Sequence, residues 1–243
     1  VISIPGDLSG MLTNLQDRDV FFIDEIHRVN TTVEEYLYSA MEDFKIDILI
    51  DSGPNARTVR IDLEPFTLVG ATTRLGNIST PMRDRFGAIF RLDFYQKDEI
   101  FKILKRTASI LEMNVQDDAL TEIAGRSRGT PRIANRVLKR VRDFAQVKNV
   151  KEISVEDARS SLDSIGIDEN GLENMDRKIL KNLIVNYNGG PTGGKSLAIS
   201  INEDIQTIED VYEPYLIKEG FIERTSRGRI ATDKAYALFD LKK

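Results

Sequence analysis

A chain of 243 residues, 41% hydrophobic and 30% charged, has the composition of a globular protein with one to three small domains. It contains no cysteine and a single histidine, His27, which excludes disulfides, thiolate metal sites and multi-histidine metal sites within one chain. Its net charge of −5 excludes a globally basic nucleic-acid binder, so any DNA contact is expected from a local basic patch. We see neither a secretory leader nor an apolar run near the roughly 18 residues of a membrane span. These features predict a cytoplasmic protein without a membrane partner.

A short apolar run at residues 20–23, Val-Phe-Phe-Ile, predicts a strand that is buried on both faces of a parallel sheet. Asp24 and Glu25 follow it directly. Such a strand presents both carboxylates at the carboxyl edge of the sheet, where α/β proteins bind their ligands. In a P-loop ATPase the aspartate helps to hold Mg²⁺ and the glutamate polarises the attacking water. Unrelated strands also end in two acids, so this motif alone leaves both interpretations open.

The next segment predicts a helix and a β-hairpin. Apolar residues at four-residue spacing between positions 33 and 41 are typical of one helix face. Alternating apolar residues on both sides of the turn-forming residues 51–55 predict a projecting hairpin, residues 46–63. The hairpin is either a plain extension of the sheet or a docking surface, and its apolar alternation favours docking.

A second apolar run, residues 66–71, ends in Thr72 and Thr73, which suit a sensor of the γ-phosphate. Two arginines follow in distinctive settings, Arg85 in Arg-Asp-Arg-Phe and Arg132 in Gly-Thr-Pro-Arg. The planar, permanently charged guanidinium suits the charge that spreads over a transferring phosphoryl group. Singly, each arginine is better explained by a surface ion pair. The order of all these segments along the chain favours an ATPase.

The remainder predicts two further domains. Residues 98–162 have helical periodicity throughout, which indicates three or four helices, and residues 166–171 have the composition of a linker. Beyond them come helical segments and then alternating residues around a Ser226-Arg227-Gly228 tip. Helices followed by a terminal hairpin describe a winged helix.

Together these segments resemble the RuvB branch of the AAA+ ATPases, and the resemblance covers nearly the whole chain. The matching stretches are the strand-Asp-Glu motif at 22–28, the lead into the hairpin at 38–44, the first sensor at 70–74, the arginine-finger segment at 83–87, the second sensor at 129–136, and the winged helix at 207–216 and 220–232. The resemblance implies an ATP-driven DNA translocase that promotes branch migration of Holliday junctions in recombination and repair.

The resemblance also implies cofactors and roles in the ATPase core. ATP and Mg²⁺ would be bound, with Asp24 as the acid linked to Mg²⁺ and Glu25 as the acid that activates water. Thr72 or Thr73 would be the first sensor. The phosphate loop is expected before Val1, so we expect the chain to be a fragment with deficient ATPase activity of its own.

Other implied roles concern neighbouring molecules and the lid. Arg132 would be the second sensor, and Arg85 a finger acting on ATP held by the next subunit of a homo-hexameric ring. The hairpin 46–63 would dock a RuvA-like junction-binding protein. Positions near the nucleotide in the family are matched by Glu42, Asp43, Phe44 and Tyr95.

Residues 189–196, Gly-Gly-Pro-Thr-Gly-Gly-Lys-Ser, match the phosphate-loop pattern formally. A true phosphate loop needs a buried strand before it and a helix N-terminus after it. Here an amphipathic helix, residues 178–188, is expected before the motif. We therefore predict a turn between two helices of the winged helix rather than an ATP site.

Charge is segregated along the winged-helix sequence. Five acids lie between residues 201 and 217, a helix without lysine or arginine, so phosphate repulsion disfavours this helix as a reader of the major groove. The wing instead carries Arg224, Arg227 and Arg229. Arginines on a hairpin tip suit contact with the DNA backbone without sequence preference. A solvated charged hairpin is the alternative interpretation.

The sequence thus predicts an α/β core, a partial P-loop AAA+ core with a parallel sheet, followed by an all-α lid and a winged-helix domain. The expected boundaries are residues 1–94, 95–166 and 167–243. The predicted function is that of a translocase subunit acting on double-stranded DNA at four-way junctions. Two alternatives stay open: another AAA+ DNA-processing ATPase, and a non-enzymatic winged-helix DNA-binding adaptor.

Overall fold

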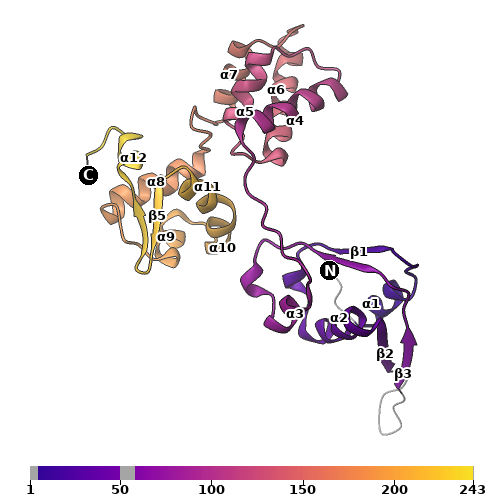
Figure 1. The fold of residues 1–243 in the computed structure, drawn as a ribbon. Helices are drawn as coiled ribbons and strands as arrows, with labels where there is room; N and C mark the ends of the chain where they lie inside the picture. Colours follow the sequence, from indigo (N-terminus) through magenta and orange to yellow (C-terminus); the bar gives the residue numbers. More distant parts are fainter. Residues whose placement is uncertain (1–4, 50–57, 243) are drawn as a thin grey trace. The chain divides into compact units, whose positions relative to one another are not determined.

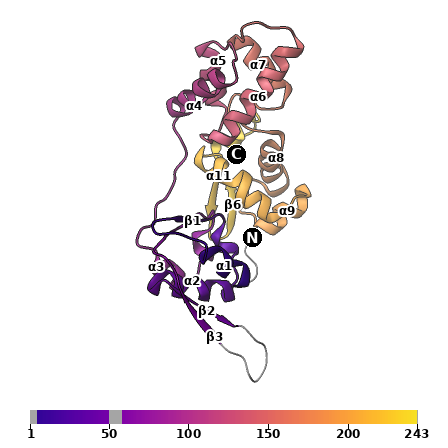
Figure 2. The ribbon, with the colours of Figure 1, turned by 90° about the vertical axis from the view of Figure 1, so that its right-hand side faces the viewer.

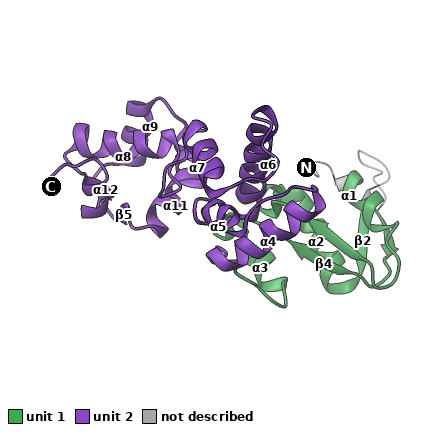
Figure 3. Cartoon of the chain, turned by 90° about the horizontal axis from the view of Figure 1, so that it is seen from above, with its two compact units in different colours: residues 1–91 green, residues 92–243 purple. Residues whose placement is uncertain are grey.

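The computed structural model describes residues 5–49 and 58–242 and divides into two compact units, Val1–Arg91 and Leu92–Lys243 (Figure 1, Figure 3). The first unit is α/β and the second combines helices with one β-hairpin. Among the described residues no helix is long and apolar enough to cross a membrane.

The first unit is built around two parallel strands. Strand β1 (Val20–Ile23) pairs with β4 (Thr67–Gly70), with Val20 opposite Thr67 and Ile23 opposite Gly70. This confirms the predicted parallel pair and brings the carboxyl ends of both strands to one edge. The other elements of the unit are α1 (Pro5–Leu12), η1 (Ile26–Arg28), α2 (Thr31–Asp43), β2 (Lys45–Leu49), β3 (Thr58–Asp62), η2 (Leu75–Asn77) and α3 (Thr80–Arg85).

The prediction that these strands are buried on both faces is wrong for the described structure. Val20 is 63% exposed, Phe22 57% and Val69 40%. The alternate side chains, such as Ile23 and Leu68, belong to or pack against the hydrophobic core that α1 and α2 help to form. Because successive strand residues point to opposite faces, a core on one side leaves the other side of this sheet accessible.

The predicted hairpin is present, and its strands project from the body of the unit (Figure 1, Figure 2). β2 and β3 pair antiparallel from Lys45 opposite Asp62 onward. Ile46 at its base is 1% exposed and belongs to the core, whereas Val59 is 41% exposed. The predicted turn at 51–55 lies outside the described residues.

The first half of the second unit is the predicted helical domain. It consists of α4 (Lys97–Ile110), α5 (Asp117–Gly125), α6 (Pro131–Val147) and α7 (Val155–Ser164). Their apolar faces share one core, which includes Leu104, Leu120, Leu138 and Leu162. α6 begins with Pro131 in its first turn, where a proline costs no hydrogen bond, as the sequence predicts.

The second half is the predicted winged helix, with its own core around Leu183, Leu216 and Phe221. Strands β5 and β6 form the wing, with Arg224 directly opposite Arg229. The elements are α8 (Asn174–Tyr187), α9 (Gly194–Ile201), α10 (Ile205–Thr207), the π-helical turn η3 (Ile208–Tyr212), α11 (Glu213–Lys218), β5 (Ile222–Thr225), β6 (Gly228–Ala231) and α12 (Asp233–Ala237).

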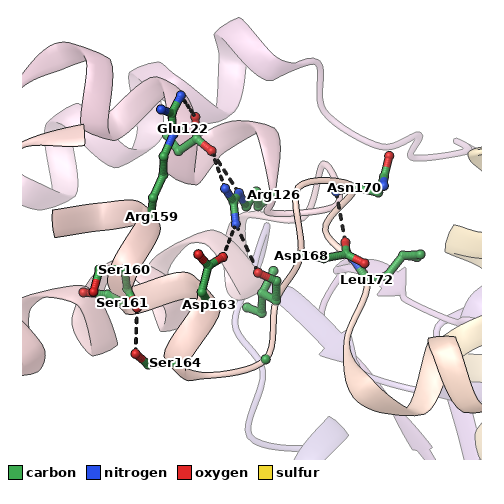
Figure 4. Close-up of polar contacts among 12 residues, drawn as sticks. Glu122, Arg126, Arg159, Ser160, Ser161, Asp163, Ser164, Asp168, Asn170 and Leu172 are labelled. Atoms are coloured by element: carbon green, nitrogen blue, oxygen red, sulfur yellow. Dashed lines mark hydrogen bonds and ion pairs between the residues drawn. The ribbon is translucent and has the colours of Figure 1, made fainter. Parts of the chain in front are cut away.

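The predicted linker is held by specific contacts (Figure 4). Arg126 of the lid donates to Glu122, to Asp163 and to the carbonyl of Ile167. Asp168 accepts the backbone N–H groups of Asn170 and Leu172 at 3.0 and 2.8 Å. The connection between lid and winged helix is therefore an ordered turn.

Candidate nucleotide site and DNA-binding wing

The acidic motif lies where the sheet predicts it. Asp24 and Glu25 follow β1, and Glu25 adopts a left-handed conformation with φ 49°, which ends the strand and starts η1. The Glu25 N–H donates to Asp24 Oδ1 at 3.0 Å, while the Asp24 side chain stays exposed. This turn separates the two carboxylates and leaves that of Asp24 exposed.

Glu25 contacts the end of β4. Its carboxylate accepts the Thr73 backbone N–H at 3.3 Å and the Thr73 hydroxyl at 3.2 Å. The Thr73 N–H, with help from the Thr73 hydroxyl and His27, lowers the pKa of the Glu25 carboxyl. The glutamate is thus ionised at neutral pH and is held against the threonine segment.

His27 is a member of this cluster that the sequence interpretation did not assign. Its Nδ1 lies 2.9 Å from Thr72 Oγ1 and 3.1 Å from Glu25 Oε2, and its side chain is only 9% exposed. Thr72 Oγ1 also accepts the Arg74 N–H at 2.9 Å. A histidine two positions after Glu25 was the available signal, but its other partner, Thr72, lies 45 residues away in the chain.

The residues present fit a magnesium-dependent nucleotide site. In the described part of the chain, no cluster of three or more His, Asp or Glu side chains forms a ready metal cage. Mg²⁺ typically needs only one or two protein carboxylates, because substrate phosphates and water supply the other ligands. Asp24, exposed at the edge of the sheet, offers such a carboxylate.

Arg85 lies at the end of α3 and is held by three contacts. It stacks over the Tyr38 ring at 4.4 Å, pairs with Glu42 at 3.1 Å and donates to the Pro81 carbonyl at 2.9 Å. Glu42 is thereby placed beside the predicted finger. Asp43 is exposed at the end of α2, and the Phe44 ring packs edge-on against Phe66.

The lid brings two other predicted residues near one another. The Tyr95 N–H donates to the Gly129 carbonyl at 2.9 Å, and Gly129 leads into Thr130, Pro131 and Arg132. Arg132 is exposed in the first turn of α6 and forms no ion pair with any residue of the described ranges. Its guanidinium is therefore accessible to a ligand.

The glycine-rich segment 189–196 has the structural context of a turn. Helix α8, not a strand, precedes it, and Lys195 is exposed at the start of α9. Thr192 exchanges backbone hydrogen bonds with Arg229 of the wing at 3.0 and 2.9 Å. A Cβ at Gly190 would overlap the Arg229 carbonyl, so close packing against β6 accounts for the glycine.

The wing arginines have unequal environments. Arg227 at the tip is exposed, and Arg224 is 56% exposed beside Glu209 at 3.4 Å. Arg229 is 7% exposed and is paired with Glu213 and, at 2.6 Å, with Glu209. The expectation that Arg229 meets DNA therefore conflicts with its burial. Arg229 fastens the wing to the helix behind it, and Arg227 and Arg224 are the accessible cations.

The same pairs change the interpretation of the acidic helix. Glu209 and Glu213 were expected to repel phosphate, but both lie against wing arginines. Glu213 is almost fully buried, and its charge is compensated by Arg229. Charges that are segregated in the sequence are thus paired in space.

A parallel strand pair with an Asp-Glu edge, a helical lid and a winged helix define a P-loop ATPase of the AAA+ class with a DNA-binding module. Family models agree over nearly the whole chain: the Holliday junction DNA helicase RuvB P-loop domain matches residues 1–92, the RuvB AAA lid domain 95–168, and the RuvB C-terminal winged helix domain 169–240. The chain belongs to the RuvB family.

Curated relatives and solved structures are consistent with this assignment. The Holliday junction branch migration complex subunit RuvB of Flavobacterium psychrophilum is 58% identical over 236 residues, covering 97% of this chain and 69% of the relative. That of Salinibacter ruber is 56% identical, covering 99% and 70%. The Thermotoga maritima RuvB Holliday junction branch migration motor matches with a TM-score of 0.88 at 47% identity, covering 100% of this chain and 76% of the structure. A mutant of that protein matches with a TM-score of 0.90, 48% identity and 100% and 77% coverage.

Proposed function

We propose that the chain acts in an ATP-driven motor that moves double-stranded DNA through four-way junctions, the branch-migration step of recombination and repair. The observation that carries this proposal is the meeting of Glu25 with Thr73 at one edge of a parallel sheet, in a chain that ends in a winged helix. Family membership supports the same function. Cytoplasmic location follows from the proposed action on cellular DNA.

In this proposal the residues that follow β1 and β4 have different roles in ATP hydrolysis. Asp24 would hold Mg²⁺, which when bound neutralises charge on the phosphates. Glu25, kept ionised by its donors, orients the attacking water and accepts its proton. Thr72 or Thr73 would sense the γ-phosphate through its hydroxyl.

Other residues complete the site from the lid and from a neighbour. Arg132 and Tyr95 would line the nucleotide on the lid side. Arg85 would act on ATP bound to the next subunit of a homo-hexameric ring, with Glu42 as its partner in the isolated unit. Asp43 and Phe44, at the end of α2, are proposed to lie near the same nucleotide.

Two surfaces would contact the partners. The hairpin 46–63 is proposed to dock a RuvA-like junction-binding protein, since Val59 leaves an apolar side chain exposed on it. Arg227 and Arg224 are proposed to contact DNA phosphates. With no neighbouring groups arranged to read bases, such contacts tolerate any sequence, which a translocating motor requires.

The experiment that tests this proposal is binding to a four-way junction and to a matched duplex across a salt series. Replacing both Arg224 and Arg227 by alanine should weaken binding to all sequences and reduce the salt slope by about one unit per lost phosphate contact. Lys195→Ala, an exposed cation on α9, is the matched control and should leave the slope unchanged. A double variant that binds like the unmodified chain would refute the wing as the DNA contact.

The alternatives predict other outcomes in turnover assays. These use an extended chain, in which a segment with the expected phosphate loop is joined before Val1. ATP hydrolysis that is stimulated by junction DNA supports the branch-migration motor. Junction binding without hydrolysis supports the non-enzymatic DNA-binding adaptor. Hydrolysis at a rate that junction DNA does not change supports another AAA+ DNA-processing ATPase.

A further inference from the structure

Helix α3, which carries Arg85 at its end, packs against one face of α2 (Figure 1). Glu34, Tyr38 and Glu42 follow one another on α2 at four-residue spacing, so they share a face of this helix. Glu34 contacts Ser79 at the start of α3, and Glu42 pairs with Arg85 at its end. Tyr38 contacts both Ser79 and Arg85. Because a helix of 6 residues is too short to be stable by itself, contacts with α2 decide where Arg85 lies.

The hydroxyl end of Tyr38 is fixed by residues of both helices. Glu34 is only 8% exposed, and its Oε2 accepts hydrogen bonds from the Tyr38 hydroxyl at 2.9 Å and from Ser79 Oγ at 2.8 Å. Ser79 Oγ also accepts the Met82 N–H at 3.3 Å and so caps α3. Burial raises the pKa of the Tyr38 hydroxyl, which therefore keeps its proton and remains a donor. The position of the ring is thus fixed relative to α2 and α3 together.

The face of the Tyr38 ring holds the Arg85 guanidinium without adding a charge. The guanidinium carbon Cζ lies 4.4 Å from the ring centre, at the distance of a cation–π contact. A buried carboxylate in the same place would neutralise the guanidinium, as Asp176 and Glu213 do for the buried arginines of the second unit. Tyr38 therefore orients Arg85 and leaves its charge available to a ligand.

The two terminal nitrogens of Arg85 differ in their partners. Nη1 donates to the Pro81 carbonyl of the same helix at 2.9 Å, and Nη2 lies 3.1 Å from a carboxylate oxygen of Glu42. The Glu42 side chain is 56% exposed, so water screens this ion pair and a phosphate can replace the carboxylate at little cost. The ring and the Pro81 carbonyl can keep their contacts during this exchange. Nη2 is therefore the nitrogen that an incoming anion reaches first.

We propose that Tyr38 is a positioning residue whose ring holds Arg85 on α3 so that the guanidinium reaches ATP bound to the next subunit. This inference rests on the proposed function, in which Arg85 is the finger. Tyr38 makes and breaks no covalent bond and acts only through Arg85. A defect at Tyr38 is therefore expected in the site of the neighbouring subunit and not in the site of the subunit that carries it.

Two substitutions in the extended chain separate the ring from its hydroxyl. Tyr38→Leu removes the aromatic face, whereas Tyr38→Phe keeps the face and loses the hydroxyl. We expect Tyr38→Leu to lower kcat for ATP by roughly 10- to 100-fold with KM nearly unchanged, because a displaced finger stabilises the transition state less. Tyr38→Phe should retain most of kcat, and Glu35→Gln, at an exposed position of the same helix, is the matched control. Equal losses of kcat in Tyr38→Phe and Tyr38→Leu, or a loss confined to KM, would overturn the proposal.

Mixtures of two variants show which subunit's site depends on Tyr38. Glu25→Gln lacks the proposed acid of its own site but keeps an intact finger. Mixed with Tyr38→Leu before assembly, it should restore hydrolysis, because in a head-to-tail ring its finger reaches the intact site of a Tyr38→Leu subunit. A mixture of Tyr38→Leu with Arg85→Ala should hydrolyse ATP no faster than Tyr38→Leu alone, since both subunits lack a working finger. Restoration by Arg85→Ala instead of Glu25→Gln, or by neither, would overturn the proposal.

A third mixture tests the proposed function separately. Arg85→Ala mixed with Glu25→Gln contains no change at Tyr38, and it should also restore hydrolysis. No restoration in this mixture would contradict a finger that acts across subunits, whatever the role of Tyr38.

The contact itself can be measured by NMR in the chain of residues 1–243, without nucleotide and without a substitution at Tyr38. The ring face should move the Arg85 Hε resonance, assigned through its loss in Arg85→Lys, upfield of the usual arginine range. This shift supports the proposal. An Hε resonance within the usual range would overturn it, even if Tyr38→Leu fails to fold.

Discussion

The arginines of the two units serve opposite purposes. In the first unit, Arg85 is held at the surface by the Tyr38 ring and an exposed glutamate. In the second, Arg128 and Arg229 are almost fully buried against Asp176 and Glu213. A buried arginine that loses its partner is very costly, whereas a half-exposed one can change partners at little cost. The exposed fraction of the side chain therefore distinguishes arginines that can reach a ligand from arginines that stabilise the fold.

The largest effect is expected at Arg85. Arg85→Ala in the extended chain should lower kcat for ATP by about 10³-fold or more while ATP affinity stays nearly constant, because a finger acts on the transition state. Steady-state turnover and equilibrium binding of labelled ATP measure the two quantities. Arg83→Ala, on the same helix, is the matched control. Normal turnover in Arg85→Ala would show that this arginine only anchors α3.

The next effect concerns the junction of lid and winged helix. Arg128 pairs with the fully buried Asp176, donates to the Gly171 carbonyl at 2.9 Å and lies 4.9 Å from the Tyr215 ring centre. Asp176→Ala leaves the buried Arg128 charge with only the more distant Glu173, at 3.8 Å, and should reduce the free energy of unfolding by about 3–5 kcal/mol. Denaturant unfolding measures this loss.

Lys105→Ala gives the comparison with an exposed pair. Lys105 and Asp117 are both more than half exposed in the same unit. A surface pair is screened by water, so the loss should be much smaller than for Asp176→Ala. Equal losses of unfolding free energy in the two variants would contradict the expected difference between buried and exposed ion pairs.

A smaller gain is expected from Glu209→Gln. Glu209 pairs with the accessible Arg224 and would compete with a DNA phosphate for that guanidinium. Its neutralisation should raise junction affinity a few-fold at low salt, in the range of about 0.5–1 kcal/mol for a partly exposed pair. Glu223→Gln, on the wing itself, controls for net charge. An equal gain in junction affinity from Glu223→Gln would show that the effect comes from the net charge and not from the pair of Glu209 with Arg224.

The smallest effect is expected at Lys195. Lys195→Ala should leave ATP binding by the extended chain unchanged, because α8 rather than a strand precedes the glycine-rich turn. Titration with labelled ATP checks this. Loss of binding would mean that the turn holds phosphate after all.

Local periodicity predicted most of the fold. The parallel pair, the helical lid and the winged helix follow from apolar spacing and turn residues within each segment. In the described residues only one face of this sheet is covered, in a chain that spans 69% of the Flavobacterium psychrophilum relative. Phe22, inside the most regular apolar run, is 57% exposed.

The site residues were predictable where their positions along the sequence determine where they lie in the sheet. Glu25 meets Thr73, and Asp24 lies at the same edge, because parallel strands end at one edge. The contact of His27 with Thr72 and the pairs of Arg229 were missed because these partners lie in other segments. A signal for Arg229 did exist: Arg224 and Arg229 are cross-strand neighbours, and two like charges there require nearby counter-charges.

The backbone bridge between Thr192 and Arg229 has a mechanical consequence. It ties β6, next to the tip of the wing, to the segment before α9 by two hydrogen bonds, and the buried pair of Arg229 with Glu213 adds a side-chain contact. A hairpin held by these contacts is rigid relative to the body of the winged helix. When the winged helix moves, the tip at Arg227 would therefore move with it almost rigidly, and a DNA backbone bound there as proposed would be displaced by the same distance.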